Sequence, residues 1–174
     1  MRTVRCTVAA ITLSVATHAA VPTQGPAIPT LRDLSGRQIQ LDDLRGRVVL
    51  IDVWATWCAP CLADLPLLRL LQREHADTLT VIGVSLDRMP RRDFVSWVRR
   101  HDVTWPQHFD GRGYASPVAI ALGVEALPAT VLIATDGSVV ARDVRGQSLA
   151  RLVRALARSA RPRTAPASAG AFTR

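Results

Sequence analysis

The run RVVLIDVW at residues 47–54 restricts the chain to few architectures. It is nearly continuous in apolar and β-branched side chains, and it lacks the polar alternation of a strand with one face in water. Such a run predicts a strand that is buried on both faces of a sheet. The run TLTVIGVS at residues 78–85 has the same character and predicts a second buried strand.

Each of these two runs is followed by a segment whose apolar residues have the spacing of a helix. Residues 59–75 carry leucines at helical positions and predict a helix that is bent or offset at Pro66, because proline has no amide donor. Residues 91–101 space their large apolar side chains for a second helix. Residues 149–156 do the same for a last, amphipathic helix.

Two hairpins complete the pattern, one around Ser35-Gly36 in residues 31–41 and another around Asp136-Gly137 in residues 131–143. Strands that alternate with helices, with an antiparallel hairpin near the end, predict an α/β fold with a sheet of mixed strand direction. The 174 residues correspond to one domain, expected at residues 27–160. A core of this size needs neither a metal nor disulfides for its stability.

The net charge of +8 is confined to the two ends of the chain. Residues 1–20 contribute +2 and residues 151–174 contribute +6, whereas the 14 arginines and 14 acids between them cancel. A neutral domain gives little support to nucleic-acid binding, so no nucleic-acid partner is expected. Arg151, Arg154 and Arg158 are expected to form the solvated face of the last helix, with weak attraction to anionic lipid as the alternative.

Residues 1–19 have the features of a secretory signal peptide. An arginine-containing start precedes an apolar run at residues 8–16, and Thr17-His18-Ala19 is the best small-x-small cleavage site. The apolar run is shorter than the roughly 20 residues that span a bilayer, which favours cleavage over an uncleaved anchor. Cys6 would be lost with this segment.

The rest of the chain outside the domain is interpreted as irregular. Residues 20–30 are proline-rich and are expected to be a linker, and residues 161–174 are expected to be a disordered basic tail. An exported mature chain would retain only Cys58 and Cys61, in a periplasmic or extracytoplasmic compartment where disulfides form.

These two cysteines lie in the motif Trp57-Cys58-Ala59-Pro60-Cys61, where the first buried strand gives way to a helix. The amides and the dipole of a helix N-terminus stabilise a thiolate, so Cys58 is expected to be the more acidic thiol. In such motifs the first cysteine has a pKa of about 3.5 to 7.5. Cys61, one turn further, is expected to be less exposed and to act as the resolving thiol of a redox disulfide.

Other functions of the cysteine pair are less consistent with the sequence. A structural disulfide that closes a two-residue loop gains little entropy. A zinc site needs four ligands, and only His75, His101 and His108 are available at unrelated spacings. A peroxidase would place a threonine three residues before its cysteine, where this chain has Ala55.

Residues 27–156 resemble the TlpA/ResA-like branch of the thioredoxin superfamily, the extracytoplasmic thiol-disulfide oxidoreductases. The resemblance rests on four segments in order: LRDLSGRQIQLDDLRGRVVLIDVW, WATWCAPCLADLP, DGRGYASPVAIALGVEALPATVLI and DGSVVARDVRG. It implies a thioredoxin fold, with a central sheet flanked by helices and an additional N-terminal β-hairpin. It also implies that Cys58 is the nucleophile and Cys61 the resolving thiol.

Further site residues follow from the resemblance together with their chemistry. Asp52 is similar to the buried aspartate of thioredoxin and is expected to accept the proton of Cys61, because an acid in an apolar strand is costly to bury. A satisfied structural acid is the alternative. Asp64 lies where ResA-like proteins carry a glutamate near the active site, although an exposed acid in the first helical turn is the alternative. The Leu127-Pro128 bond is expected to be cis, with Leu127 pairing with a substrate strand, and Trp57 is expected to contact substrate.

The sequence therefore predicts an exported protein-disulfide reductase without a bound cofactor. Its expected partners are disulfides of other exported proteins, apocytochrome c among them, and a membrane-bound thiol electron donor. A monomer is expected. A dithiol oxidase is the alternative within the enzyme class, because the residues Ala59-Pro60 do not fix redox poise. A copper chaperone is the alternative within the binding class, although its relatives carry three residues between the cysteines.

Overall fold

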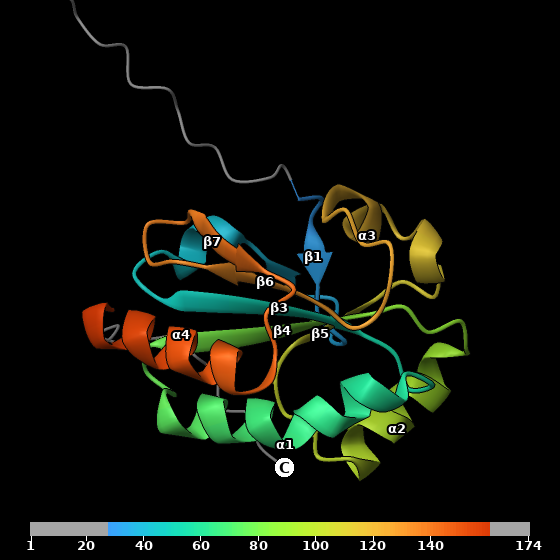
Figure 1. Cartoon of the computed structure of the whole chain (residues 1–174). Coiled ribbons are helices and arrows are strands. Elements are labelled where there is room, and N and C mark those ends of the chain that lie inside the picture. Colours follow the sequence, from blue (N-terminus) through green and yellow to red (C-terminus); the bar gives the residue numbers. More distant parts are fainter. Residues whose placement is uncertain (1–27, 161–174) are drawn as a thin grey trace, which may run out of the picture.

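The computed structural model describes residues 28–160, and a five-stranded mixed sheet forms its centre (Figure 1). The strand order is β5-β4-β3-β6-β7. β3 pairs in parallel with β4 and antiparallel with β6, so the sheet is mixed as predicted. The strands are β3 (Val48–Trp54), β4 (Leu79–Ser85), β5 (Gln107–Phe109), β6 (Ala129–Ile133) and β7 (Val139–Arg142).

The two strands that the apolar runs predict are the inner strands β3 and β4. All seven residues of β3 are buried, as are six of the seven in β4. Burial on both faces explains why neither sequence alternates between polar and apolar residues. The short β5 was not predicted, because three residues, Gln107–Phe109, give no periodicity of their own.

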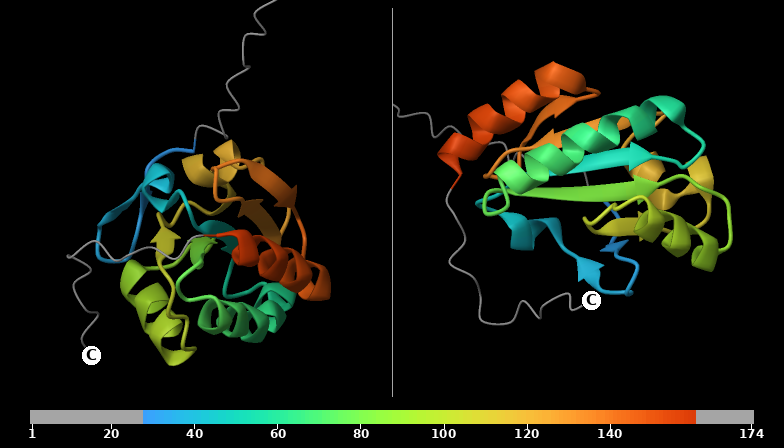
Figure 2. Two further views of the ribbon diagram at one scale, coloured as in Figure 1. Left: turned by 90° about the vertical axis from the view of Figure 1, so that its left-hand side faces the viewer. Right: turned by 90° about the horizontal axis from the view of Figure 1, so that it is seen from below.

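Three long helices cover one face of the sheet, and Figure 2 shows this arrangement from two further directions. Val48, Leu50 and Trp54 point to this face and pack in one core cluster with residues of all three helices. The first helix runs continuously through Pro66. The helices are α1 (Ala59–Glu74), α2 (Arg91–Arg100) and α4 (Gly146–Ser159).

The opposite face is covered by smaller elements. Val49, Ile51 and Val53 pack there against Leu31 and Val118 in a second core cluster. The predicted N-terminal hairpin is present with two residues in each strand, and the short helix α3 was not predicted. These elements are β1 (Leu31–Arg32), β2 (Gln38–Ile39), the 3-10 turns η1 (Leu41–Leu44) and η2 (Gly113–Ala115), and α3 (Pro117–Ala121).

Gly83 in β4 lies where the Gln107 side chain packs directly against the backbone of the sheet. Trp54 donates its indole N–H to Gln107 Oε1 over 2.9 Å, and the Gln107 amide fills the space above Gly83. A Cβ atom at Gly83 would lie 2.1 Å from Gln107 Oε1, so a larger residue there requires the Gln107 side chain to move from its bond with Trp54. The ring of Trp54 also packs on Phe94 and Trp97, with centroid distances of 5.9 and 5.3 Å.

Several predictions concern segments outside the described residues. These are the signal peptide at residues 1–19 with Cys6, most of the linker at residues 20–30, and the tail at residues 161–174. Within residues 28–160, no helix is long and apolar enough to cross a membrane.

Candidate active site

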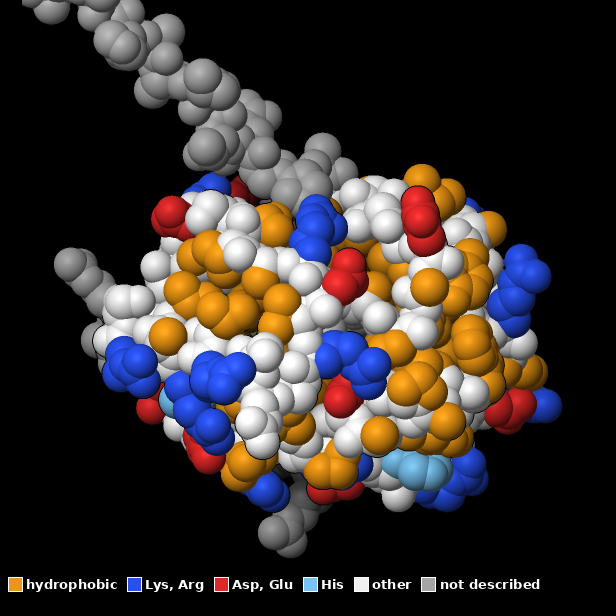
Figure 3. Space-filling model, viewed as in Figure 1, with side chains coloured by type: hydrophobic (Ala, Val, Ile, Leu, Met, Phe, Trp, Pro, Cys, Tyr) orange, Lys and Arg blue, Asp and Glu red, His pale blue; other side chains and the backbone are white. Residues whose placement is uncertain are grey.

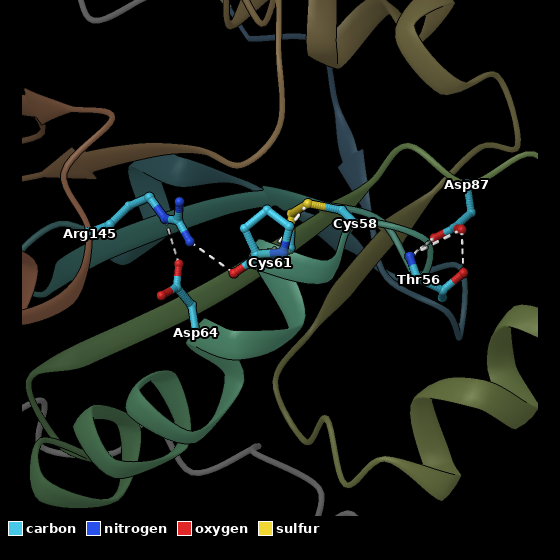
Figure 4. Close-up of a disulfide and its surroundings, with 7 residues drawn as sticks. Thr56, Cys58, Cys61, Asp64, Asp87 and Arg145 are labelled. Carbon is cyan, nitrogen blue, oxygen red and sulfur yellow. Dashed lines mark hydrogen bonds and ion pairs between the residues drawn. A yellow bond between two sulfur atoms is a disulfide. The ribbon is translucent and has the colours of Figure 1, made fainter.

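Cys58 and Cys61 are joined by a disulfide at the N-terminus of α1, directly beyond the carboxyl end of β3 (Figure 4). Cys58 is the N-cap residue of the helix, and its Sγ accepts a hydrogen bond from the amide of Cys61 over 3.3 Å. In the reduced protein this amide donor would stabilise a thiolate on Cys58, as the position of the motif predicts. Pro60 lies in the first turn, where its missing amide donor costs little.

Both cysteines are almost covered in this oxidised state. Cys58 is 5% exposed and Cys61 is 3% exposed, so the predicted difference in exposure is small. Trp57, in contrast, is 59% exposed immediately before the pair. A large aromatic side chain that faces solvent is therefore adjacent to the disulfide.

Asp52 lies on β3 and is buried, with 5% of its surface exposed. Because side chains alternate along a strand, Asp52 lies on the same face of β3 as Leu50 and Trp54, the face that the long helices cover. Burial and, to a smaller extent, the negative charge of Asp64 raise the pKa of Asp52 to about 7, against the opposing positive charge of Arg145. The side chain can thus gain and lose a proton near neutral pH, as a proton acceptor must.

Asp64 on α1 is partly buried, with 22% of its side-chain surface exposed. Its Oδ2 accepts a hydrogen bond from Arg145 Nε over 2.6 Å, and Arg145 Nη2 donates to the carbonyl of Pro60 over 2.8 Å (Figure 4). Arg145 immediately precedes α4 and was missed in the sequence. Nothing in the local pattern distinguishes it from the other arginines, because its partners lie more than 80 residues away.

Asp87 is a second residue that sequence reasoning missed. It is fully buried, and its carboxylate accepts hydrogen bonds from the amide of Thr56, from Thr56 Oγ1 over 2.6 Å and from Ser85 Oγ over 2.8 Å. These bonds fix the turn between β3 and Cys58. The sequence does contain a signal, because an acid two residues after a buried parallel strand lies at the same sheet edge as the end of β3.

The Leu127-Pro128 peptide bond is cis, as the resemblance implies. Ala129 pairs with Val53, so Pro128 lies beside the end of β3 that leads to the cysteines. Leu127 is half-buried and contacts both core clusters. The chain before β6 therefore leads into the strand that pairs with the last residues of β3, and the substrate contact of Leu127 stays a prediction.

The three histidines of the described residues lie in separate places. His75 follows α1, His101 stacks on the ring of Trp97 at 3.7 Å, and the Nδ1 of His108 on β5 accepts the amide of Arg32 over 3.1 Å. Among residues 28–160 there is no group of three histidine, cysteine or acidic side chains that could hold a metal ion.

The surface around the disulfide is partly apolar. Figure 3 shows hydrophobic side chains gathered over the N-terminal end of α1 and over the region of α3. Large exposed apolar residues come from these parts of the chain, among them Trp57, Tyr114 and Ile120. Such a patch on a small domain is typical of a surface that contacts another protein.

Comparison with curated proteins finds thiol-disulfide oxidoreductases. The thioredoxin-like protein YneN of Bacillus subtilis is 35% identical over 86 residues, which are 48% of this chain and 51% of that protein. The thiol-disulfide oxidoreductase ResA of Bacillus cereus is 30% identical over 121 residues, which are 69% of this chain and 68% of that protein. The chain spans about half to two thirds of the length of these relatives.

Solved structures agree with the fold. A thiol-disulfide oxidoreductase from Bacteroides fragilis matches with a TM-score of 0.69 and 25% identity, covering 76% of this chain and 99% of that chain. A putative thiol:disulfide interchange protein DsbE from Chlorobium tepidum matches with a TM-score of 0.67 and 25% identity over 76% and 95% of the two chains.

A sequence model of the AhpC/TSA family matches residues 22–142, well over half of the chain. The site geometry and the relatives narrow this assignment, because the chain joins two cysteines at the start of α1 and carries the cis Pro128 beside them. The chain belongs to the AhpC/TSA family and, within the thioredoxin superfamily, to its ResA/TlpA-like type.

Proposed function

We propose that the protein is an exported thiol-disulfide oxidoreductase that works mainly as a disulfide reductase on other exported proteins. The observation that carries this proposal is the Cys58–Cys61 disulfide at the N-cap of α1, with the buried Asp52 on the adjoining strand. The named activity of ResA relatives supports it.

The reaction uses the two sulfurs alone. The thiolate of Cys58 attacks one sulfur of a substrate disulfide, that bond breaks, and the departing thiolate takes a proton from water. Cys61 then gives its proton to the carboxylate of Asp52, and its thiolate attacks Cys58 Sγ in the mixed disulfide. The second substrate thiolate leaves, so two electrons pass to the substrate and the Cys58–Cys61 disulfide forms.

Return to the reduced state needs a dithiol donor. A membrane-bound thiol protein is proposed for this role, and it would supply two electrons and two protons by the same exchange. The basic start and short apolar run of residues 1–19 support an exported location, and apocytochrome c is a proposed target because of the family resemblance. The exposed Trp57 and the neighbouring apolar surface support a protein as substrate.

The direction of the reaction is tested by the reduction potential of the Cys58–Cys61 couple. The protein is equilibrated with glutathione mixtures, and the oxidised fraction is measured by thiol alkylation. A reductase is expected to lie near the potential of thioredoxin, about −270 mV. A potential near the strongly oxidising end, about −120 mV, would exclude the reductase and favour an oxidase.

The roles of the two cysteines are tested by trapping. In Cys61→Ser the mixed disulfide cannot be resolved, so a disulfide-bonded target should accumulate on Cys58. The matched variant Cys58→Ser should trap nothing. Accumulation in Cys58→Ser alone would show that the nucleophile is Cys61 instead.

A further inference from the structure

The short segment of residues 143–145 connects β6, which follows Pro128, with α1, which carries the cysteines. Thr130, at the start of β6, donates its Oγ1 hydrogen to the carbonyl of Val144 over 2.9 Å, and its own carbonyl accepts the amide of Asp143 over 2.8 Å. Arg145, the next residue, reaches α1. The segment thus ties the strand that follows Pro128 to the helix that carries the cysteines.

Arg145 holds the N-terminal part of α1 at two points, one in the first turn and one in the second. Asp64 and Pro60 are four residues apart, so the carboxylate and the carbonyl lie on one face of the helix, and a single guanidinium bonds both. The Pro60 carbonyl belongs to the peptide bond that leads into Cys61. The positive charge of Arg145 is therefore one peptide unit away from the resolving cysteine.

The same guanidinium acts on Asp52. Thr130 is the residue opposite Asp52 in the β3–β6 ladder, which places the tied segment beside this carboxyl group. The charged side chains that act on Asp52 are Asp64 from α1 and Arg145 from the start of α4, and they act in opposite directions on its pKa. The Cys58–Cys61 disulfide on α1 carries no charge in this state.

A second ion pair between the same two helices provides a comparison. Arg154 of α4 donates to Glu74 Oε2 over 2.9 and 3.1 Å at the far end of α1. It has the same chemistry as the Arg145–Asp64 pair, but neither Arg154 nor Glu74 acts on Asp52. A role specific to Arg145 can thus be separated from the general joining of α1 and α4.

We propose that Arg145 is a positioning residue for the resolving step: it clamps the first two turns of α1 and supplies the positive charge that keeps Asp52 able to accept the proton of Cys61. Asp64 is the partner that holds the guanidinium in place and partly offsets its charge. This inference rests on the proposed function, because it assigns a role within the dithiol reaction. It predicts that removal of Arg145 and removal of the Asp64 charge shift the titration of Asp52 in opposite directions.

The direct test is an NMR titration of the Asp52 carboxyl carbon in the oxidised protein. Arg145→Gln should move the midpoint to higher pH, and Asp64→Asn should move it to lower pH. Arg145→Lys should keep a midpoint closer to that of the unsubstituted protein, because it keeps the charge. Arg154→Gln, the matched control, should leave the midpoint unchanged. Equal midpoints in Arg145→Gln and Arg154→Gln would overturn the proposal.

The kinetic test follows release of a mixed disulfide from Cys58 as a function of pH. Arg145→Gln should shift the rising limb of the profile to higher pH, and a shift of half a pH unit gives roughly a threefold loss of rate below the midpoint. Arg154→Gln should show the unsubstituted profile. An unshifted profile in Arg145→Gln would contradict the role in proton transfer.

The two proposals fail in distinguishable ways. The titration uses the oxidised protein and needs no substrate, so it remains informative if Cys61→Ser traps no target and the proposed function fails. Normal trapping with an unshifted Asp52 midpoint would overturn the role of Arg145 alone. If Arg145→Gln does not fold, Arg145→Met, which keeps a long side chain without the charge, carries the test, because an unchanged midpoint in that variant would overturn the proposal.

Discussion

Replacing Asp52 with asparagine should remove a penalty that the folded protein carries at neutral and alkaline pH. The carboxyl group is buried in β3, and its pKa rises from an ordinary value of 3.8 to about 7. Between these two values the folded state holds a proton that the unfolded chain has lost. The free energy of unfolding therefore falls as pH rises through this range.

The size of this effect follows from the two pKa values. Below the unfolded pKa both states are mostly protonated and Asp52 contributes little, and well above the folded pKa both are ionised and the penalty is constant. Between about pH 5 and pH 8 the ionisation of Asp52 lowers the free energy of unfolding by roughly 2–3 kcal/mol. The asparagine side chain does not titrate, so this loss is absent from Asp52→Asn.

The measurement is urea denaturation of the oxidised protein at several pH values between about 5 and 8, for the unsubstituted chain and for Asp52→Asn. The difference in unfolding free energy between the two should grow in favour of the variant by roughly 2–3 kcal/mol across this range. Any pH-independent cost of the new amide cancels in this comparison. Asp77→Asn, which alters an exposed carboxyl group, is the matched control and should show no such trend.

A difference between Asp52→Asn and the unsubstituted protein that stays constant across this pH range would refute the reasoning. It would mean that Asp52 ionises at the same pH in the folded and unfolded states. The carboxyl group would then be a satisfied structural acid, without the property that a proton acceptor for Cys61 requires.

Three further substitutions test other parts of the structure. Trp57→Ala should change the free energy of unfolding by no more than about 0.5 kcal/mol, because the side chain is 59% exposed. It should lower kcat/KM for a protein disulfide but not for a small disulfide, and equal losses with both substrates would argue against a docking role. Gly83→Ala should destabilise the fold by about 1–3 kcal/mol in urea denaturation, since its Cβ would meet Gln107 Oε1 at 2.1 Å, and an unchanged midpoint would show that Gln107 moves freely. Thr56→Val should cost about 1–3 kcal/mol by the same assay, because the buried Asp87 loses a hydroxyl donor, whereas a neutral effect would indicate that water replaces it.

Much of the fold could be predicted because its signals are local. The apolar runs at residues 47–54 and 78–85 became the inner strands β3 and β4, and the helical spacing at residues 59–75 became α1. The position of Cys58 at the start of that helix followed from the same boundary. The short elements β5 and α3 were missed, because three and five residues are too few to show a period.

Only part of the candidate site could be predicted from the sequence. Cys58 and Cys61 are three residues apart, and Asp52 stood out as an acid within an apolar run. Pro128 was placed by resemblance, and the structure shows its bond as cis, beside the end of β3. The surroundings of these residues depend on segments that meet only when the sheet and helices pack.

The amino-acid sequence by itself determined the buried strands, the helix that begins at the cysteine pair and the presence of an acid on the strand that leads to it, because hydrophobic periodicity and helix capping act between near neighbours. Tertiary structure alone decided that Arg145 bonds Asp64 across 81 residues, and that Asp87 holds Thr56 across 31 residues. Those contacts set the charge and the hydrogen bonds around Asp52 and Cys58. They arise from packing: the place of Asp87 after a buried strand indicates its edge of the sheet but not its partner Thr56, and no local pattern marks Arg145.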